Sequence, residues 1–171
     1  GAVTLVSGSI SGTTGSLAAA SYTVQSGVIT AKLAGTGGLS KTGNGTVSVK
    51  GETGQKALTG TYVAGKQDGV WTWFFDSGAV QRKFVFASGS GPGIEYLDGD
   101  GSKKSKEYSL TEGLLDGPYA EYQPDGVVIA QQGAYVDGHR SGTWTTFNAK
   151  GKPAASACYG ASVYLHAGEC A

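Results

Sequence analysis

The chain has no methionine, only two cysteines and four prolines, and just 15% of its 171 residues are charged. Lys and Arg together number 13, as do Asp and Glu, so the formal net charge is zero. A neutral chain offers no basic patch to nucleic acid or to an anionic membrane surface, and we expect neither partner. No stretch approaches the ~18 consecutive apolar residues that a membrane-spanning helix needs.

The ends of the chain indicate where the protein is found. It opens on Gly1 without a methionine, so we expect a mature or excised fragment from which any signal peptide is missing. Cys158 and Cys170 lack zinc-site spacing and form no CxxC pair. A disulfide between them would close a short loop, add about 2–4 kcal/mol and require an oxidising compartment. The alternative is two buried thiols in a cytosolic protein; we favour the disulfide and a secreted or cell-surface location.

What the chain has in excess is glycine, at 30 residues, together with many Val, Thr and Tyr residues. This composition favours β-strands joined by tight turns, so we predict an all-β fold. Residues 1–54 carry four charges and a single aromatic residue, Tyr22, and their short alternating apolar runs predict short strands between Gly/Ser/Thr turns. This segment has too little large apolar side chain to fill a core alone. It is therefore either a flexible linker or, as we favour, an oligomerising stem.

A repeated pattern begins at Lys56 and defines a second predicted domain, residues 55–171. A glycine is followed by an aromatic residue two positions later, another five positions later, and a glycine nine positions later. The three full copies begin at Gly69, Gly117 and Gly142, and a degenerate copy begins at Gly91. This period of about 25 residues fits a strand, a glycine turn, a second strand and another turn. The Asp-Gly pairs at residues 68–69, 116–117, 125–126 and 137–138 are predicted turns.

Residues 56 to about 155 resemble the MORN repeat, in the variant found in bacterial secreted proteins and antitoxin-like proteins. The resemblance implies an array of antiparallel hairpins whose repeated aromatics stack into one spine. MORN arrays generally serve as binding or scaffolding surfaces, so it implies no particular ligand. Residues 1–54 resemble, in texture only, the stems of trimeric fibre proteins, which implies a homotrimer.

Three features with some likeness to reactive sites lack essential parts. Residues 60–66 match the start of a phosphate-binding loop, but Gln67 stands where Ser or Thr is required and no helical pattern follows. Residues 98–102 resemble the start of a calcium loop, but its sixth and twelfth positions do not fit. His139 and His166 have no carboxylate or nucleophile at a recognisable spacing. We therefore predict no enzymatic activity, no metal and no cofactor.

Binding is the better-supported class of function. The repeat aromatics Trp71, Tyr119 and Trp144 are predicted to be structural, whereas the variable residues near the middle of each repeat's leading strand are where such arrays carry specificity. The candidate ligand-binding residues are Trp73, Glu95, Glu121, Thr145 and Arg140. An aromatic side chain beside carboxylates is a common way to hold a sugar ring, although Trp73 could equally fill a gap or an interface. The basic residues at 103–106 are expected to solvate a turn.

Two hypotheses follow. The first is the tip of an extracellular fibre-like adhesin, with residues 1–54 as a trimeric stem and the repeats recognising glycans or the envelope of another cell. The second is a monomeric MORN scaffold that binds a protein or lipid in the periplasm or cytosol, with residues 1–54 as a linker. They differ in oligomeric state and in the disulfide.

Overall fold

The computed structural model describes residues 2–7, 9–10, 16–18, 21–25, 28–29, 32–34, 39–41, 43–50, 55–97, 99, 101–160 and 163–165. All regular secondary structure within these residues is β-strand, and no helix occurs among them, so the predicted all-β fold is confirmed. The chain forms two compact units, Gly1–Ser88 and Gly89–Ala171.

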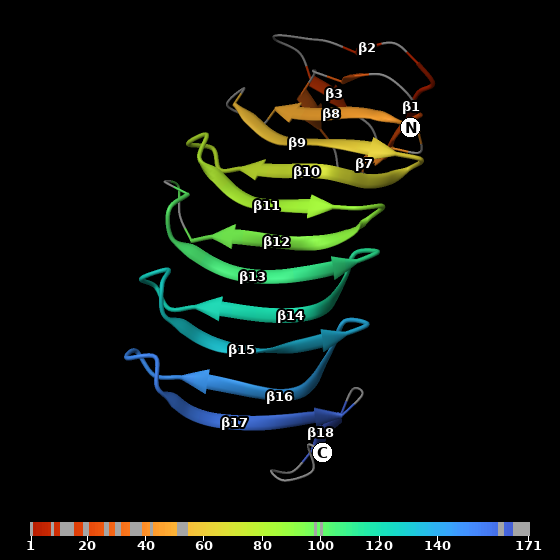
Figure 1. Ribbon diagram of the computed structural model, residues 1–171. Coiled ribbons are helices and arrows are strands. Elements are labelled where there is room, and N and C mark those ends of the chain that lie inside the picture. The colour runs from red at the N-terminus through yellow and green to blue at the C-terminus, as the bar shows by residue number, and fades with distance from the viewer. Residues whose placement is uncertain are drawn as a thin grey trace. The chain divides into compact units, whose positions relative to one another are not determined.

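The first unit begins with short parallel strands (Figure 1). They are β1 (Ala2–Leu5), β2 (Ser9–Ile10), β3 (Ser16–Ala18), β4 (Ser21–Val24), β5 (Val28–Ile29), β6 (Lys32–Ala34) and β7 (Leu39–Lys41). Each strand from β4 to β6 pairs in parallel with the strand three places earlier, and β7 pairs with β4. The chain therefore winds as a solenoid whose successive coils hydrogen-bond to each other. The predicted trimer of such segments stays a prediction.

Antiparallel pairing takes over in the second half of this unit. Its strands are β8 (Gly45–Lys50), β9 (Lys56–Val63), β10 (Lys66–Phe74) and β11 (Val80–Phe86), and they pair in chain order. The change of pairing comes close to the predicted boundary at residue 54. The compact unit continues past that boundary because β8 pairs with β9 along its whole length, with Val47 opposite Gly60.

The second unit is a meander of hairpins (Figure 1). Its strands are β12 (Ser90–Tyr96), β13 (Lys104–Thr111), β14 (Leu114–Tyr122), β15 (Ile129–Val136), β16 (His139–Phe147), β17 (Pro153–Gly160) and β18 (Val163–Leu165). Each strand pairs antiparallel with its neighbours in sequence. Burial is therefore built up locally, one hairpin against the next.

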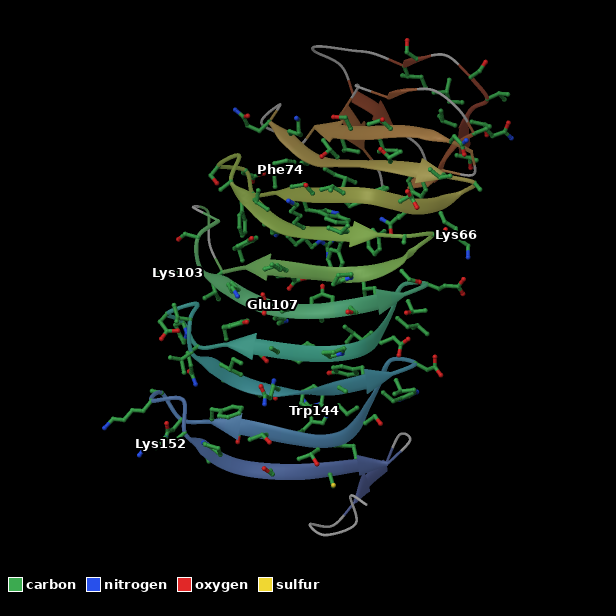
Figure 2. All side chains as sticks on the ribbon, viewed as in Figure 1. Lys66, Phe74, Lys103, Glu107, Trp144 and Lys152 are labelled. Carbon is green, nitrogen blue, oxygen red and sulfur yellow. The ribbon has the colours of Figure 1, made fainter. Side chains whose placement is uncertain are left out.

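The hairpin turns of the second unit alternate between two lengths. At Glu112-Gly113 and Asp137-Gly138 both residues have positive φ, at 52° and 88° and at 49° and 82°, which is the type I′ turn that matches strand twist. The longer turns use a side chain as a cap: Asp125 Oδ1 accepts hydrogen bonds from the amides of residues 127 and 128, at 2.9 and 3.0 Å. Figure 2 shows Lys103 and Lys152 at the end of the sheet that carries the longer turns.

Two of the four predicted Asp-Gly turns were wrong. Residues 68–69 lie within β10 and residues 116–117 within β14. Gly69, Gly117 and Gly142 have positive φ, at 68°, 101° and 65°, and the pairing register shifts next to them. The repeat glycine therefore makes a β-bulge instead of a turn, because only glycine adopts this backbone without strain. The pairs at 125–126 and 137–138 do lie in turns.

Candidate functional site

The repeat tryptophans are core residues in both units. Trp71 is 2% exposed and Trp144 is 3% exposed. The indole Nε1 of Trp71 donates to the carbonyl of Thr61 at 2.9 Å, and that of Trp144 donates to the carbonyl of Ala134 at 3.1 Å. Each ring lies directly on a glycine of the preceding strand, Trp71 on Gly60 and Trp144 on Gly133, where a methyl group would come within about 2.5 Å of the ring atoms. These contacts agree with the structural role predicted for this position.

Around Trp144 the second unit forms an aromatic cluster, which consists of Tyr108, Tyr119, Tyr135, Trp144 and Tyr159. Tyr119 and Tyr135 contact the Trp144 ring at centroid distances of 5.4 and 5.1 Å. Tyr108 extends the cluster from Tyr119 at 6.2 Å, and Tyr159 extends it from Trp144 at 6.4 Å. Burial, followed by the negative charge of Glu121, raises the pKa of Tyr119 to about 12. Its hydroxyl is therefore a hydrogen-bond donor at every physiological pH.

A row of polar side chains lies next to this cluster on the same face of the sheet. Tyr119 and Glu121 are two residues apart on β14, so their side chains point to the same face. Glu121 is directly opposite Lys106 on β13 and Gln131 on β15. Lys106 is in turn opposite Glu95 on β12, and Gln131 is opposite Thr146 on β16. The polar row therefore crosses five neighbouring strands and consists of Glu95, Lys106, Glu121, Gln131 and Thr146.

Hydrogen bonds hold the carboxylates of the polar row in place. The Tyr108 hydroxyl donates to Glu95 Oε1 at 2.7 Å, and Gln131 Nε2 donates to Glu121 Oε2. All four of these side chains are partly exposed. Of the two oxygens of Glu121, only Oε2 has a hydrogen-bond partner among the described residues. The row thus presents fixed donors and acceptors to solvent, which is the arrangement expected of a preorganised polar binding surface.

Two predicted ligand-binding residues, Glu95 and Glu121, belong to the polar row. The prediction for Thr145 was wrong, because Thr145 does not occupy the position that Glu121 has in its repeat. Thr145 follows Trp144 directly, so its side chain points to the opposite face, where its hydroxyl lies 3.3 Å from that of Ser156. Thr146 occupies the position equivalent to Glu121. Its hydroxyl donates to the carbonyl of Ala155 at 3.3 Å.

Trp73, in the first unit, is half-buried within another aromatic group. Its ring lies 5.7 Å from Trp71 and 5.9 Å from Phe84. The Arg82 guanidinium lies over the Trp73 ring at 4.3 Å from its centroid. One face of the ring is therefore covered by a cation.

Arg140 lies at the edge of the aromatic cluster. Its guanidinium carbon lies 4.0 Å from the centroid of Trp144 and 5.5 Å from that of Tyr159. It donates a hydrogen bond to the hydroxyl of Tyr159 at 3.3 Å, and Tyr135 is its direct cross-strand neighbour on β15. Burial lowers the pKa of Arg140, but the two tyrosine hydroxyls more than offset it and raise the pKa overall. The side chain is thus a permanently charged group held in one orientation.

The predicted basic stretch contains an ion pair. Lys104 Nζ lies 3.0 Å from Glu107 Oε1 and 3.4 Å from the Tyr122 hydroxyl, which donates to Glu107 Oε2. Burial acts to raise the pKa of Glu107, but the hydrogen bonds from Tyr122 and Lys104 lower it overall. Figure 2 labels Glu107 on β13. Lys104 thus neutralises a carboxylate, while Lys106 belongs to the polar row.

The remaining sequence candidates form no reactive site among the described residues. Residues 60–66 lie on the end of β9, the turn that follows it and the first residue of β10, and His139 is exposed at the start of β16. His166, and two of the residues in the calcium-like stretch, lie outside the described part of the chain. In the described part, no group of three His, Cys, Asp or Glu residues is placed to hold a metal. No helix there is long and apolar enough to cross a membrane.

The predicted disulfide also falls partly outside the described residues. Cys158 is 5% exposed, on β17 next to the aromatic cluster. Cys170 lies in the part of the chain that is not described, so the bridge between them stays a prediction.

Sequence reasoning missed four residues of this surface: Tyr108, Lys106, Gln131 and Thr146. Lys106 was noted only as part of a basic stretch, and Gln131 carried no pattern at all. Their place beside Glu95 and Glu121 follows from the strand register, which a single sequence does not contain.

No family model and no curated protein sequence matches this chain. Among solved structures, it is similar to a mutant of S. aureus TarM in complex with fondaparinux, alpha-GlcNAc-glycerol and UDP, with 12% sequence identity and a TM-score of 0.40. The likeness covers 57% of this chain and 19% of the TarM chain. A likeness this weak carries nothing about ligand or activity over to this chain.

Proposed function

We propose that this chain is a non-enzymatic, extracellular binding module whose second unit recognises a saccharide on the envelope of another cell. The observation that supports it best is the polar row, in which Glu121 and Glu95 are each held by a neighbouring side chain beside the tyrosines of the aromatic cluster.

The chemistry of this surface suits a sugar ring. A saccharide presents hydroxyl groups along its edge, which bond to carboxylates and amides, and C–H groups on its faces, which pack on aromatic rings. Glu121 and Gln131 offer an acceptor and a donor side by side, and Tyr108 and Tyr119 supply ring surface next to them. Because these groups are already fixed by mutual hydrogen bonds, little side-chain entropy is lost on binding.

The proposal also covers the type of the repeats and the role of residues 1–54. The hairpin units are of MORN type, and residues 1–54 form the stem of a homotrimeric, fibre-like adhesin with this surface at its tip. The solenoid winding of the described strands β1–β7 is compatible with an elongated stem.

The test is a glycan array probed with the intact chain, followed by titration calorimetry with the best-bound saccharide. Substituting Glu121→Gln keeps the shape of the side chain but removes its charge, and we expect a loss of affinity of about tenfold, as for one charge-assisted hydrogen bond. Thr146→Ala and Thr145→Ala form a matched pair, since the residues are adjacent but lie on opposite faces. Only Thr146→Ala should weaken binding. If no saccharide binds, or if Glu121→Gln binds as tightly as the parent, the proposal is wrong.

A further inference from the structure

The polar row is long, and it runs across the strands of the second unit. Its five side chains are directly opposite one another in the strand register, one from each of the strands β12 to β16. Neighbouring strands lie about 4.8 Å apart, so the row from Glu95 to Thr146 covers about 19 Å. The next residue in the register, Ala155 on β17, has no polar side-chain atom, so the row ends there. A single sugar ring is much shorter than this row and would leave most of it without a contact.

The aromatic cluster runs in the same direction as the polar row. Tyr108 lies on β13, Tyr119 on β14 and Trp144 on β16. Tyr108 and Tyr119 each stand two residues from the polar-row residue of their own strand, which is about 7 Å along the strand. A ligand that lies along a strand meets the polar row only once. An elongated ligand that lies across the strands follows both the polar row and the edge of the aromatic cluster.

The side chains of the row offer both donors and acceptors. The carboxylates of Glu95 and Glu121 are acceptors, and the Lys106 ammonium is a donor. The Gln131 amide and the Thr146 hydroxyl are each both donor and acceptor. A sugar hydroxyl also donates and accepts, so hydroxyls spaced along a saccharide chain find a partner at successive strands. A ligand that repeats along its length therefore matches a surface that repeats from strand to strand.

The charges on this face favour an uncharged chain. Lys106 is directly opposite Glu95 and Glu121, so the sign of the charge alternates between neighbouring strands. Arg140 adds a second positive charge beside the aromatic cluster. A chain with an acidic group on every ring would bring negative charges against the two carboxylates, and a chain of basic sugars would bring positive charges against Lys106. Like charges placed side by side are unfavourable, so either chain loses affinity.

We propose that the polar row binds a linear, uncharged oligosaccharide that lies across β12 to β16 and is contacted at several of its sugar rings at once. This inference rests on the function proposed above, and it names the class of saccharide that the second unit recognises.

The experiment is a chain-length series, measured by titration calorimetry on the intact chain. The probes are the dimers, tetramers and hexamers of the cello-, malto- and chito-oligosaccharides, which are linear and uncharged. In each series the dimer is shorter than the row and the hexamer is longer. We expect at least one series to bind, with the hexamer about tenfold or more tighter than the dimer, because contacts at further strands add hydrogen bonds.

Two matched pairs of hexamers test the charge preference. Galacturonic acid hexamer is compared with its uncharged methyl ester. Glucosamine hexamer is compared with the chito-oligosaccharide hexamer, both in a mildly acidic buffer in which the free amines are charged. In each pair the uncharged form should bind more tightly, and its affinity should change little with salt concentration because no charge on the ligand is screened.

Variants at the two ends of the row test the extended contact. Glu95→Gln and Thr146→Ala should each weaken hexamer binding by about three- to tenfold, as for one hydrogen bond. Both should leave dimer binding unchanged, because Glu121 and Gln131 at the middle of the row hold the dimer. Thr145→Ala is the matched control on the opposite face of β16, and it should change neither affinity. The length series on the unmutated protein stands even if a variant fails to fold.

The outcomes separate this inference from the proposed function. Equal affinity for dimer and hexamer overturns the extended contact but leaves saccharide binding standing, and so does a charged hexamer that binds more tightly than its uncharged counterpart. End variants that weaken the dimer as much as the hexamer also overturn it. If none of the uncharged hexamers binds, the inference is wrong; a glycan bound on the array then still supports the proposed function, whereas an array without binding overturns that function as well.

Discussion

The contact between Gly133 and Trp144 gives a sharp test of how the repeat is held together. A Cβ atom at Gly133 would lie 2.4 Å from Trp144 Cδ2, well inside van der Waals contact, and the indole is too enclosed to move away. We expect Gly133→Ala to lower the free energy of unfolding by about 1–3 kcal/mol, as overpacking of a core does. Trp144→Ala should cost about 3–5 kcal/mol because a large buried ring is lost.

The double variant Gly133→Ala/Trp144→Ala tests the contact between the two residues directly. Without the indole the added methyl group meets no ring, and alanine is then better than glycine in a strand by about 0.5–1 kcal/mol. Gly133→Ala should therefore stabilise the Trp144→Ala background, which gives a coupling of about 1.5–4 kcal/mol in the double-mutant cycle. The assay is urea unfolding followed by far-UV circular dichroism, which does not depend on the tryptophan signal.

Gly138→Ala is the matched control. Its turn position has a φ of 82° and its nearest neighbour would be Leu114 at 3.8 Å, so its cost is backbone strain of about 1–2 kcal/mol. That cost should be the same with and without Trp144. The pair Gly60 and Trp71, with a Cβ-to-ring distance of 2.1 Å, should repeat the coupling in the first unit. Additive effects of Gly133→Ala and Trp144→Ala would refute the packing interpretation.

Three further outcomes are expected. Because the pKa of Tyr119 is raised to about 12 in the folded chain, from 10.0, stability should be complete below pH 10 and fall as the pH rises toward 12. Tyr119→Phe should flatten that fall in pH-dependent unfolding. The lowered pKa of Glu107 has the opposite sign, so its contribution is lost as the pH falls through the folded pKa, and Glu107→Gln should show a weaker acid dependence. Peptide mapping without reductant should recover Cys158 linked to Cys170, and light scattering should give the mass of a trimer; free thiols or a monomer would contradict the secreted fibre.

The spacing of glycines and aromatics was enough to predict the hairpin array. The glycine spacing and the aromatic spacing can both be read within one repeat. The aromatic residue two positions after the repeat glycine is Trp71 in one copy and Trp144 in another, and both side chains are buried. The β-bulges at Gly69 and Gly117 were not predicted, because an Asp-Gly pair favours positive φ equally in a turn and in a bulge. Which applies depends on where the partner strand ends.

The candidate site was only half accessible from the sequence. Glu95 and Glu121 stood out as variable positions within the repeat, but their neighbours come from other strands and depend on register. Thr146 stands four residues after Gly142, as Glu121 stands four residues after Gly117, so the repeat spacing alone identifies Thr146, and Thr145 was misplaced by one residue. That single residue puts its side chain on the opposite face of the strand. Likewise, the short runs in residues 1–54 indicated strands, whereas their parallel pairing depends on which segments meet after one coil.

In the second unit every strand from β12 to β18 hydrogen-bonds only to strands next to it in sequence. Its contact order is accordingly low for an all-β protein, since no distant loop must close before a pairing is rewarded. A hairpin is complete as soon as its second strand is available, and the next one adds to its edge. Such a unit is able to fold from its N-terminal end while the ribosome is still synthesising the rest of the chain. Its first strands can pair before its last strand has been made.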